Sequence, residues 1–349
     1  MKKDLKELNF EELKSELSLM GEKPFRAAQI FSWMHKSLVC SIDDMTNISL
    51  KLREKLKEEY SYTVLEQEEK QVSKLDDTAK YLFRLPDGNC VESVRMVYKH
   101  GVSVCISSQV GCRMGCKFCA STLGGLVRGL SAAEMLEQIY SIERDTGSRV
   151  DNIVIMGIGE PMDNYDEVVK FIRMITDERG LNISGRNITV SSCGLVPEIK
   201  RFAGEKLQVT LAISLHAVTD EKRRKIMPVA NKYSIEELME AVDVFFETTG
   251  RRVSFEYALI AGVNDTEDDA KALAGLAFSH KCHVNLIPVN PVTERGLSAP
   301  DRTHVLKFQN MLEKKGINAT IRREMGRDID GACGQLRRKR NVVDNSGEA

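Results

Sequence analysis

The stretch Cys112-Arg-Met-Gly-Cys116-Lys-Phe-Cys119 places three cysteines within eight residues, with no fourth cysteine nearby. A structural zinc ion is normally held by four side chains, and nothing near this stretch completes such a set. Three thiolates can instead hold three irons of a [4Fe–4S] cluster and leave the fourth iron open to bind another molecule. The spacing therefore favours a cluster with one open iron over a closed zinc site.

The sequence around this motif alternates between short apolar runs and amphipathic helical patterns. The runs expected to form strands are 102–107, 152–157, 187–192, 209–214, 253–260 and 283–288, with 318–322 as a late addition. Two helix starts between them are marked by capping boxes, Ser131-Ala-Ala-Glu134 and Ser234-Ile-Glu-Glu237. Buried strands separated by helices are typical of a parallel sheet covered by crossover helices. We expect a β/α barrel, full or partial, with its chemistry at the carboxyl ends of the strands.

The residues before these strands have a different pattern. Residues 1–75 are charged and carry apolar residues three to four positions apart, which predicts a small helical module. Residues 76–101 contain the turn signal Pro86-Asp87-Gly88 between runs of β-forming residues, which predicts a hairpin or linker. We expect residues 102–340 to form the barrel and residues 341–349 to form a flexible tail.

Composition sets broad limits on function. Lys and Arg number 50 against 51 Asp and Glu, so binding to a polyanion such as RNA would depend on local basic patches. The opening residues lack the apolar stretch of an export signal, and no run approaches the length of a membrane span. The odd number of cysteines, 9, argues against a disulfide framework. We expect a cytoplasmic protein with no membrane part.

A CxxxCxxC motif just after the first strand of a β/α barrel resembles the signature of the radical SAM superfamily, in which the open iron is chelated by S-adenosylmethionine (SAM). The resemblance implies a partial (β/α)6 radical SAM barrel with an N-terminal helical accessory domain and a β-hairpin extension. Cys112, Cys116 and Cys119 would then ligate the cluster. The residues expected to bind SAM at the strand ends are Gly159, Glu160, Ser191, Ser214, Leu215, His216 and Asn290.

Six motifs narrow the resemblance to the RlmN family of adenine-C2 RNA methyltransferases, over roughly residues 20–338. They are "CISSQVGCRMGCKFCA", "GIGEPMDNYDEV", "AISLHA", "EYALIAGVND", "CHVNLIPVNP" and "DIDGACGQLR". The resemblance implies that the enzyme forms 2-methyladenosine in 23S ribosomal RNA, at the peptidyl transferase centre, and in tRNA, at the adenosine 3′ of the anticodon. It also implies a low-potential electron donor of the flavodoxin or ferredoxin type.

The same resemblance assigns three residues outside the cluster to the reaction, which consumes two SAM molecules per turnover. Cys333 would accept a methyl group from one SAM, and a radical made from a second SAM would convert it to a carbon that adds to adenine C2. Cys105 would resolve this covalent protein–RNA intermediate by forming a disulfide with Cys333. Glu92 would remove the C2 proton. From the residues alone, Cys105 reads as a buried core thiol and Glu92 equally well as a solvated hairpin charge.

Adenine C2 is an electron-poor carbon that cannot attack the methyl group of SAM directly, which is why a radical route is needed. Three alternatives stay open at this point. The related Cfr family methylates C8 of the same adenine, and Val110 stands where a cysteine is expected in that relative. A radical SAM activase or electron carrier would not account for Cys105 together with Cys333. The third is a zinc-containing RNA-binding protein without enzymatic activity.

RNA contacts are expected on two basic stretches. One is the N-terminal "KPFRAAQIFSWMHK", in which Lys23, Arg26 and Lys36 would meet phosphates while Phe25, Phe31 and Trp33 pack inward. The other contains Arg223, Arg224 and Lys225, after the fourth strand of the predicted barrel. The remaining cysteines, Cys40, Cys90, Cys193 and Cys282, receive no role.

Overall fold

The computed structural model describes residues 2–290, 296–331, 334 and 336. Its α-helices are α1 (Phe10–Leu19), α2 (Phe25–His35), α3 (Leu50–Glu59), α4 (Ala132–Thr146), α5 (Tyr165–Ile175), α6 (Val196–Gly204), α7 (Asp220–Ile226), α8 (Ile235–Thr249), α9 (Glu267–Ser279) and α10 (Arg302–Glu313). Its strands are β1 (Glu66–Val72), β2 (Ala79–Arg84), β3 (Cys90–Tyr98), β4 (Gly101–Cys105), β5 (Gln109–Gly111), β6 (Leu126–Gly129), β7 (Asn152–Ile155), β8 (Ile188–Ser192), β9 (Thr210–Ser214), β10 (Val253–Leu259), β11 (His283–Pro288) and β12 (Ala319–Ile321).

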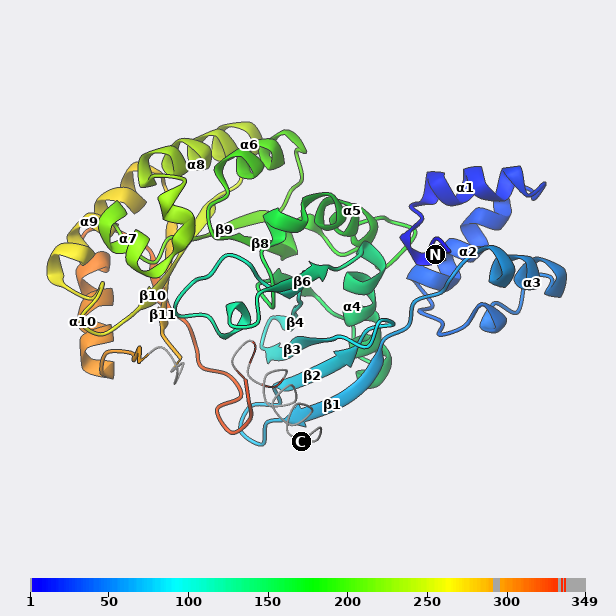
Figure 1. Cartoon of the computed structure of the whole chain (residues 1–349), viewed down its shortest axis with the longest axis horizontal. Helices are drawn as coiled ribbons and strands as arrows, with labels where there is room; N and C mark the ends of the chain where they lie inside the picture. The colour runs from blue at the N-terminus through cyan, green and yellow to red at the C-terminus, as the bar shows by residue number, and fades with distance from the viewer. Residues whose placement is uncertain (1, 291–295, 332–333, 335, 337–349) are drawn as a thin grey trace.

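The main sheet has the strand order β1-β2-β3-β4-β7-β8-β9-β10-β11-β12. All neighbours from β4 to β12 pair in parallel, and each connection between them passes through at least one helix. These helices cover the outside of the sheet (Figure 1). Because β1 and β12 are the two edges, the barrel is partial. The predicted partial β/α barrel is confirmed, with β12 as a further parallel strand beyond the (β/α)6 core.

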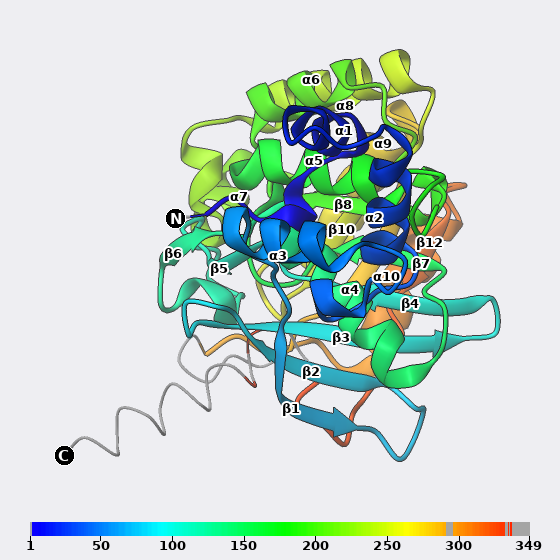
Figure 2. The ribbon, with the colours of Figure 1, turned by 90° about the vertical axis from the view of Figure 1, so that its right-hand side faces the viewer.

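An antiparallel extension continues the sheet beyond β4. Strands β2 and β3 form the predicted hairpin, with Arg84 opposite Cys90 on either side of the Pro86-Asp87-Gly88 turn. Strand β1 pairs antiparallel with β2, although its residues fall within the range expected to be helical. The extension forms a layer along one side of the molecule in Figure 2. The helical part of the N-terminal region therefore ends before β1, and the predicted tail at 341–349 lies outside the described residues.

The N-terminal helices α1–α3 have a hydrophobic core of their own. These helices form a module at one end of the molecule, next to α4 and α5 (Figure 1). A fully buried ion pair joins this module to the barrel, because Lys6 Nζ lies 2.5 Å from Glu137 Oε1 on α4. Lys6 also donates to the carbonyl of Thr63 at 2.7 Å. A buried charge that loses its partner is strongly destabilising. The module is therefore held in one position against α4.

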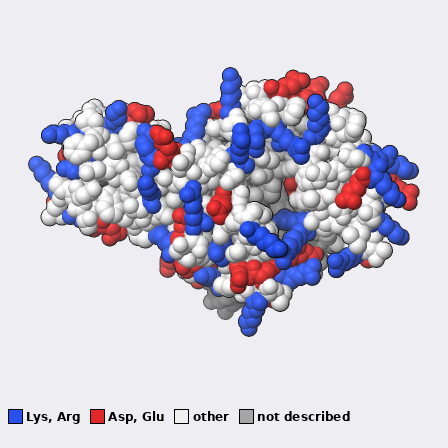
Figure 3. Space-filling model, turned by 180° about the vertical axis from the view of Figure 1, so that it is seen from behind, with Lys and Arg blue, Asp and Glu red and all other residues white. Residues whose placement is uncertain are grey.

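Charged side chains are interspersed over the face opposite to that of Figure 1, as expected from a net charge of −1. Lys and Arg side chains border a hollow near the centre of this face (Figure 3). The described residues contain no helix that is long and apolar enough to cross a bilayer.

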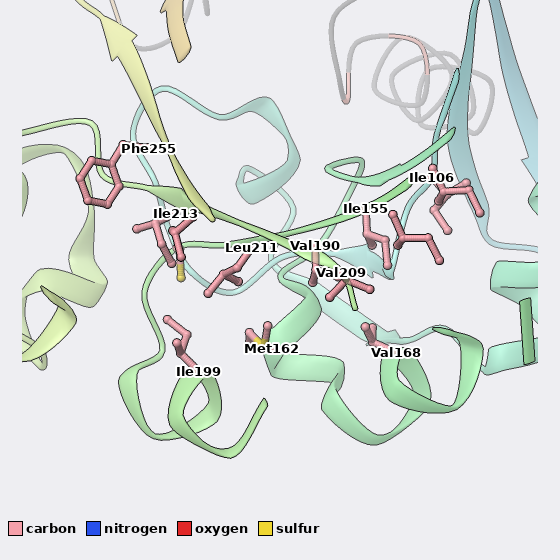
Figure 4. Close-up of a cluster of buried hydrophobic side chains, with 14 of the residues drawn as sticks. Ile106, Ile155, Met162, Val168, Val190, Ile199, Val209, Leu211, Ile213 and Phe255 are labelled. Carbon is pink, nitrogen blue, oxygen red and sulfur yellow. The ribbon is translucent and has the colours of Figure 1, made fainter. Parts of the chain in front are cut away.

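The parallel strands are apolar on one face and largely polar on the other. On the outer face, Ile155, Val190, Leu211 and Phe255 are at most 1% exposed and pack under the helices (Figure 4). The inner-face residues Val154, Thr189, Thr210, Ser254, Glu256, Asn285 and Thr320 line a cavity. The period of two in a strand separates the two sets. The polar residues in these apolar runs thus belong to the barrel interior, where the chemistry is expected.

His35 is a fully buried histidine at the contact between the N-terminal module and the barrel. Its Nδ1 lies 2.8 Å from the hydroxyl of Tyr140 on α4. Burial lowers the pKa of His35 to about 3, and the nearby Lys6 acts in the same direction. The ring is therefore neutral in the folded protein at physiological pH.

We expect the free energy of unfolding to decrease as the pH falls below 6.5. The unfolded chain binds a proton on His35 near its ordinary pKa of 6.5, whereas the folded chain does so only near 3, so the stability present above pH 6.5 is lost on acidification. The loss from this residue should reach ~1.4 kcal/mol one pH unit below 6.5. Urea unfolding of the wild type and His35→Gln at pH 7.5 and 5.5 measures it. An equally steep pH dependence in both proteins would contradict the assignment.

Candidate active site

The three motif cysteines lie on the loop that joins β5 to β6. Gly111 has a φ of +80°, and a Cβ at this position would lie 2.0 Å from the carbonyl oxygen of Gly125, so only glycine fits where the two ends of the loop meet. The N–H of Cys112 donates to the same oxygen at 2.8 Å. The hydroxyl of Thr122 donates to the carbonyls of Cys116 and Cys119. The chain around all three thiols is therefore fixed by local hydrogen bonds.

Burial raises the pKa of all three motif thiols, that of Cys112 to about 12. For Cys116 the next causes are Cys119 and Cys112, so the thiols lie close enough to repel each other's charge. Such thiols stay protonated unless bound metal displaces the proton. Within the described residues no three His, Cys, Asp or Glu side chains are close enough to hold a single metal ion. Three cysteine thiols on one loop are the donors that an iron–sulfur cluster takes, so this donor set fits such a cluster.

The segment "GIGEP" after β7 approaches the start of β5 closely. A Cβ on Gly159 would lie 2.7 Å from the Cβ of Gln109, and its φ is +116°, so this position requires glycine. The carboxylate of Glu160 is buried and accepts hydrogen bonds from the N–H groups of Cys193 at 2.8 Å and Met162 at 3.1 Å. Burial raises the pKa of Glu160. Gly159 and Glu160 thus lie at the strand end where SAM binding is predicted.

The other residues expected to bind SAM also lie at or beyond the carboxyl ends of strands. Ser191 and Ser214 are half-buried in β8 and β9, Leu215 is buried directly after β9, and Asn290 is exposed after β11 and lines the cavity. Parallel strands present their carboxyl ends on one rim, which brings these residues to the same side of the barrel.

His216 has a defined tautomer. Its Nδ1 accepts a hydrogen bond from the N–H of Ala258 at 2.8 Å, which places the proton of the neutral ring on Nε2. Burial lowers its pKa to about 3, with a further contribution from Arg223. The ring packs edge-on against Phe118 of the cysteine loop, with centroids 4.6 Å apart. His216 therefore links the end of β9 to the loop that carries the cluster ligands.

Arg223 corrects one prediction. It is fully buried rather than exposed to RNA, because its guanidinium donates to the carbonyls of Cys193 at 2.6 Å and Leu215 at 3.2 Å. Arg223 therefore draws the ends of β8 and β9 together from beneath the rim. Its place in the run "DEKRRK" suggested a solvated helix face, and nothing in that run distinguishes it from its exposed neighbours Arg224 and Lys225.

The N-terminal basic stretch is partly as predicted. Lys23 and Lys36 are exposed and Phe31 is fully buried. Phe25 is 50% exposed, so the expectation that it packs inward is wrong. Its ring faces the guanidinium of Arg26 at 4.9 Å. Phe25 is the first residue of helix α2.

Cys105 and Glu92 lie at one cavity of about 710 Å³ in the barrel interior. Cys105 ends β4, and burial raises the pKa of its thiol, which the nearby Arg322 partly offsets. Glu92 on β3 is only 2% exposed, so it is not a solvated hairpin charge. Asn290 lines the same cavity, which links it to the rim where SAM is expected.

The buried carboxylate of Glu92 has two identified partners. Lys80 on β2 lies 2.9 Å away, and the N–H of Gly334 donates to Oε2 at 2.7 Å. A Cβ on Gly334 would lie 3.0 Å from the hydroxyl of Ser121, two residues after Cys119. Gly334 thus lies between Glu92 and the cysteine loop. Cys333, the preceding residue in the sequence, lies outside the described residues. Lys80 was missed because a lysine in an edge hairpin is usually a solvated charge.

Two family models match this chain, one at the N-terminal module and one at the barrel. Residues 3–61 match the family model of the ribosomal RNA large subunit methyltransferase N-terminal domain, and residues 106–274 match that of the radical SAM superfamily. A solved radical SAM methyltransferase from Sphaerobacter thermophilus aligns with a TM-score of 0.91 and 41% identity, over 95% of this chain and 98% of that one. The fold and the cysteine motif therefore agree with the family models.

Two relatives are each named as a probable dual-specificity RNA methyltransferase RlmN. The protein from Lachnospira eligens is 62% identical over 96% of both chains. The protein from Lachnoclostridium phytofermentans is 58% identical over 96% of this chain and 94% of its own length. The family's cofactors are a [4Fe–4S] cluster and SAM, for which the cysteine loop and the strand ends are suited. The chain belongs to the RlmN family and is a radical SAM enzyme that methylates RNA.

Proposed function

We propose that this enzyme methylates C2 of adenine in 23S ribosomal RNA, at the peptidyl transferase centre, and in tRNA, at the adenosine 3′ of the anticodon. The observation that supports the proposal is that two of the three reaction residues lie at one cavity, beside a residue that neighbours the third in the sequence. Cys105 and Glu92 line it, and Gly334, which follows Cys333 in the sequence, is hydrogen-bonded to Glu92. A simple SAM-cleaving activase would need neither a second cysteine nor a buried base at this position.

The chain offers one set of residues for each of the two cofactors. Cys112, Cys116 and Cys119 would hold the cluster, and Gly159, Glu160, Ser191, Ser214, Leu215, His216 and Asn290 would hold SAM at the rim. Together the bound cofactors supply radical chemistry that can remove hydrogen from an unactivated carbon. The protein contributes position and the exclusion of water, because the carboxylate of Glu160 and the ring of His216 are both buried.

Each of the three reaction residues has a separate step in the proposed mechanism. Cys333 would carry the methyl group that becomes bonded to adenine C2. Glu92, held in a buried position within the cavity, would take the C2 proton. Cys105 would then attack the sulfur of Cys333, so that the sulfur–sulfur bond forms and the carbon–sulfur bond breaks. The carbon would keep the electron pair of that bond and take up a proton, which makes it the methyl group on the RNA. Since burial raises the pKa of Cys105, its thiol stays protonated and unreactive towards SAM until that step.

The partners follow from this chemistry. The disulfide and the cluster both have to be reduced in each cycle, which calls for a thiol reductant and a low-potential electron donor such as a flavodoxin or ferredoxin. RNA would approach a surface whose hollow is bordered by Lys and Arg side chains (Figure 3). A reducing compartment containing ribosomes and tRNA is the cytoplasm, where we place the enzyme.

We expect anaerobic incubation with unmodified ribosomal RNA or tRNA, SAM and a low-potential reductant to yield 2-methyladenosine. The position of Val110, where the C8-methylating relative is expected to carry cysteine, favours C2 over C8. Nucleoside chromatography with mass spectrometry against both methyladenosine standards distinguishes the products. A dominant 8-methyladenosine peak would assign the chain the activity of the Cfr family instead.

A further inference from the structure

The segment from Arg322 to Gly331, here called the strap, crosses the open side of the partial barrel. It leaves the edge strand β12 and reaches the hairpin of β1 and β2 at the other edge of the sheet. In Figure 1 it runs below the barrel towards β1 and β2. The strap contains no helix or strand. The N–H of its first residue, Arg322, donates to the carbonyl of Leu286 on β11, and the contacts beyond it involve side chains. Its far end leads directly to Cys333 in the sequence.

Three side-chain contacts anchor the strap to the hairpin from outside. The carboxylate of Asp328 accepts hydrogen bonds from the hydroxyl of Ser73 at 2.6 Å and the N–H of Lys74 at 2.8 Å. Asp76 accepts one from the N–H of Gly326 at 3.0 Å. Gln71 on β1 pairs with Asp330, accepting from its N–H at 3.0 Å and donating to its carboxylate at 3.2 Å. All of these contacts come from one hairpin, β1–β2 and its loop.

A fourth contact lies inside and reaches the cavity. Lys80 is fully buried, and its Nζ lies 2.6 Å from the carbonyl oxygen of Asp330 and 2.9 Å from the carboxylate of Glu92. Glu92 in turn accepts the hydrogen bond from Gly334. Lys80 and Glu92 therefore hold the chain on both sides of residues 331–333. One ammonium group ties the cavity carboxylate to the backbone of the strap.

A buried ion pair is weak evidence for stability, because apolar residues of similar volume often stabilise a fold as well or better. The Lys80–Glu92 pair does something that an apolar pair could not. The ammonium group of Lys80 orients both the carboxylate of Glu92 and the main-chain carbonyl of Asp330. Misplacement of a reacting group by ~1 Å costs roughly a hundredfold in rate. A reaction that joins Cys333, an RNA base and Cys105 in turn depends on such positioning.

We propose that Lys80 and Asp328 are positioning residues that hold the strap, which leads to Gly334, against the cavity that contains Glu92 and Cys105. This inference rests on the proposed function for the roles of Cys333 and Glu92. The position of the strap itself does not depend on those roles. The β1–β2 hairpin is then the docking site of the strap. Loss of these contacts uncouples SAM cleavage from RNA methylation and leaves the cluster and SAM sites intact.

The test compares Asp328→Ala and Lys80→Met with matched controls in the anaerobic holoenzyme. Asp166→Ala removes an exposed aspartate that pairs with Arg201 on the outside of the barrel. Lys70→Met removes a hairpin lysine that pairs with Asp145 rather than with the strap. Hydrogen exchange of strap peptides, followed by mass spectrometry without RNA, should become roughly fivefold faster or more in Asp328→Ala, since two hydrogen bonds to the strap are lost. The controls should exchange like the wild type.

The second readout is the number of SAM molecules cleaved per methyladenosine formed. We expect this ratio to rise about tenfold or more in Lys80→Met, because misplaced groups still permit SAM cleavage but not transfer. Asp328 is exposed, so Asp328→Ala is expected to fold. If Lys80→Met does not fold, hydrogen exchange in Asp328→Ala tests the proposal. Unchanged exchange in Asp328→Ala, or wild-type coupling in a folded Lys80→Met, overturns the proposal. A product other than 2-methyladenosine would refute the proposed function without altering the exchange result.

Discussion

Cys105→Ala is expected to accumulate in cells as a covalent complex with RNA. The variant retains the cluster loop, the rim residues and Cys333, so each step up to formation of the bond with adenine can proceed. Without the Cys105 thiol, no group at the end of β4 can attack the sulfur of Cys333. Turnover should fall by about 10³-fold or more, as on loss of other covalent-catalysis groups.

The complex is measured on a denaturing gel, with and without ribonuclease, and by mass spectrometry of the peptide that contains "GACGQLR". A carbon–sulfur link survives denaturant and thiol reductants, whereas a disulfide or a tight non-covalent complex does not. Cys282→Ala is the control, because Cys282 is also buried but precedes β11 at the opposite end of the strand from the rim. Normal turnover by Cys105→Ala, or an adduct on another cysteine, would show that the two cysteine roles are assigned wrongly.

Cys116→Ala should lose the cluster and with it all SAM cleavage. Three thiolates leave one iron of four open, and a two-thiolate site cannot hold the remaining irons in the same geometry. The variant should therefore contain well under half of the about four irons per chain expected of the wild type. The same result is expected for Cys112→Ala and Cys119→Ala, since the three thiols share one loop.

Iron and sulfide assays, together with the visible absorption of the anaerobically reconstituted protein, measure this loss. Cys193→Ala is an informative control, because its thiol is buried beside Glu160 but lies outside the motif. It should keep its iron. A full, SAM-cleaving cluster in Cys116→Ala would rule out the ligand assignment and would mean that another residue completes the set.

Local sequence patterns predict much of the candidate site. The spacing of Cys112, Cys116 and Cys119 is a one-dimensional property, and a loop of eight residues brings such thiols together in almost any surrounding fold. The capping boxes at Ser131 and Ser234 were likewise predicted and are formed, because they involve residues three positions apart. The strand predictions held for the same reason, since apolar runs between helices report burial directly.

Predictions about individual charges were less secure, because burial depends on what packs above a residue. Arg223 and Arg224 are adjacent on α7, yet only Arg223 is buried, where it binds the carbonyls at the ends of two strands. Strand β1 was expected to be helical because its charged residues resemble those of the preceding helices. Pairing with β2 overrides that local preference.

By itself, the sequence determined the cluster motif, the alternation of strands and helices, and the family of the chain. Only the tertiary structure decided that Glu92 is buried, that Lys80 is its partner, and that the strap is anchored on the β1–β2 hairpin. Glu92 and Gly334 are 242 positions apart and meet through one hydrogen bond. Periodicity and spacing record interactions along a few turns of chain, whereas such contacts arise only when the two edges of an open sheet are brought together by its curvature.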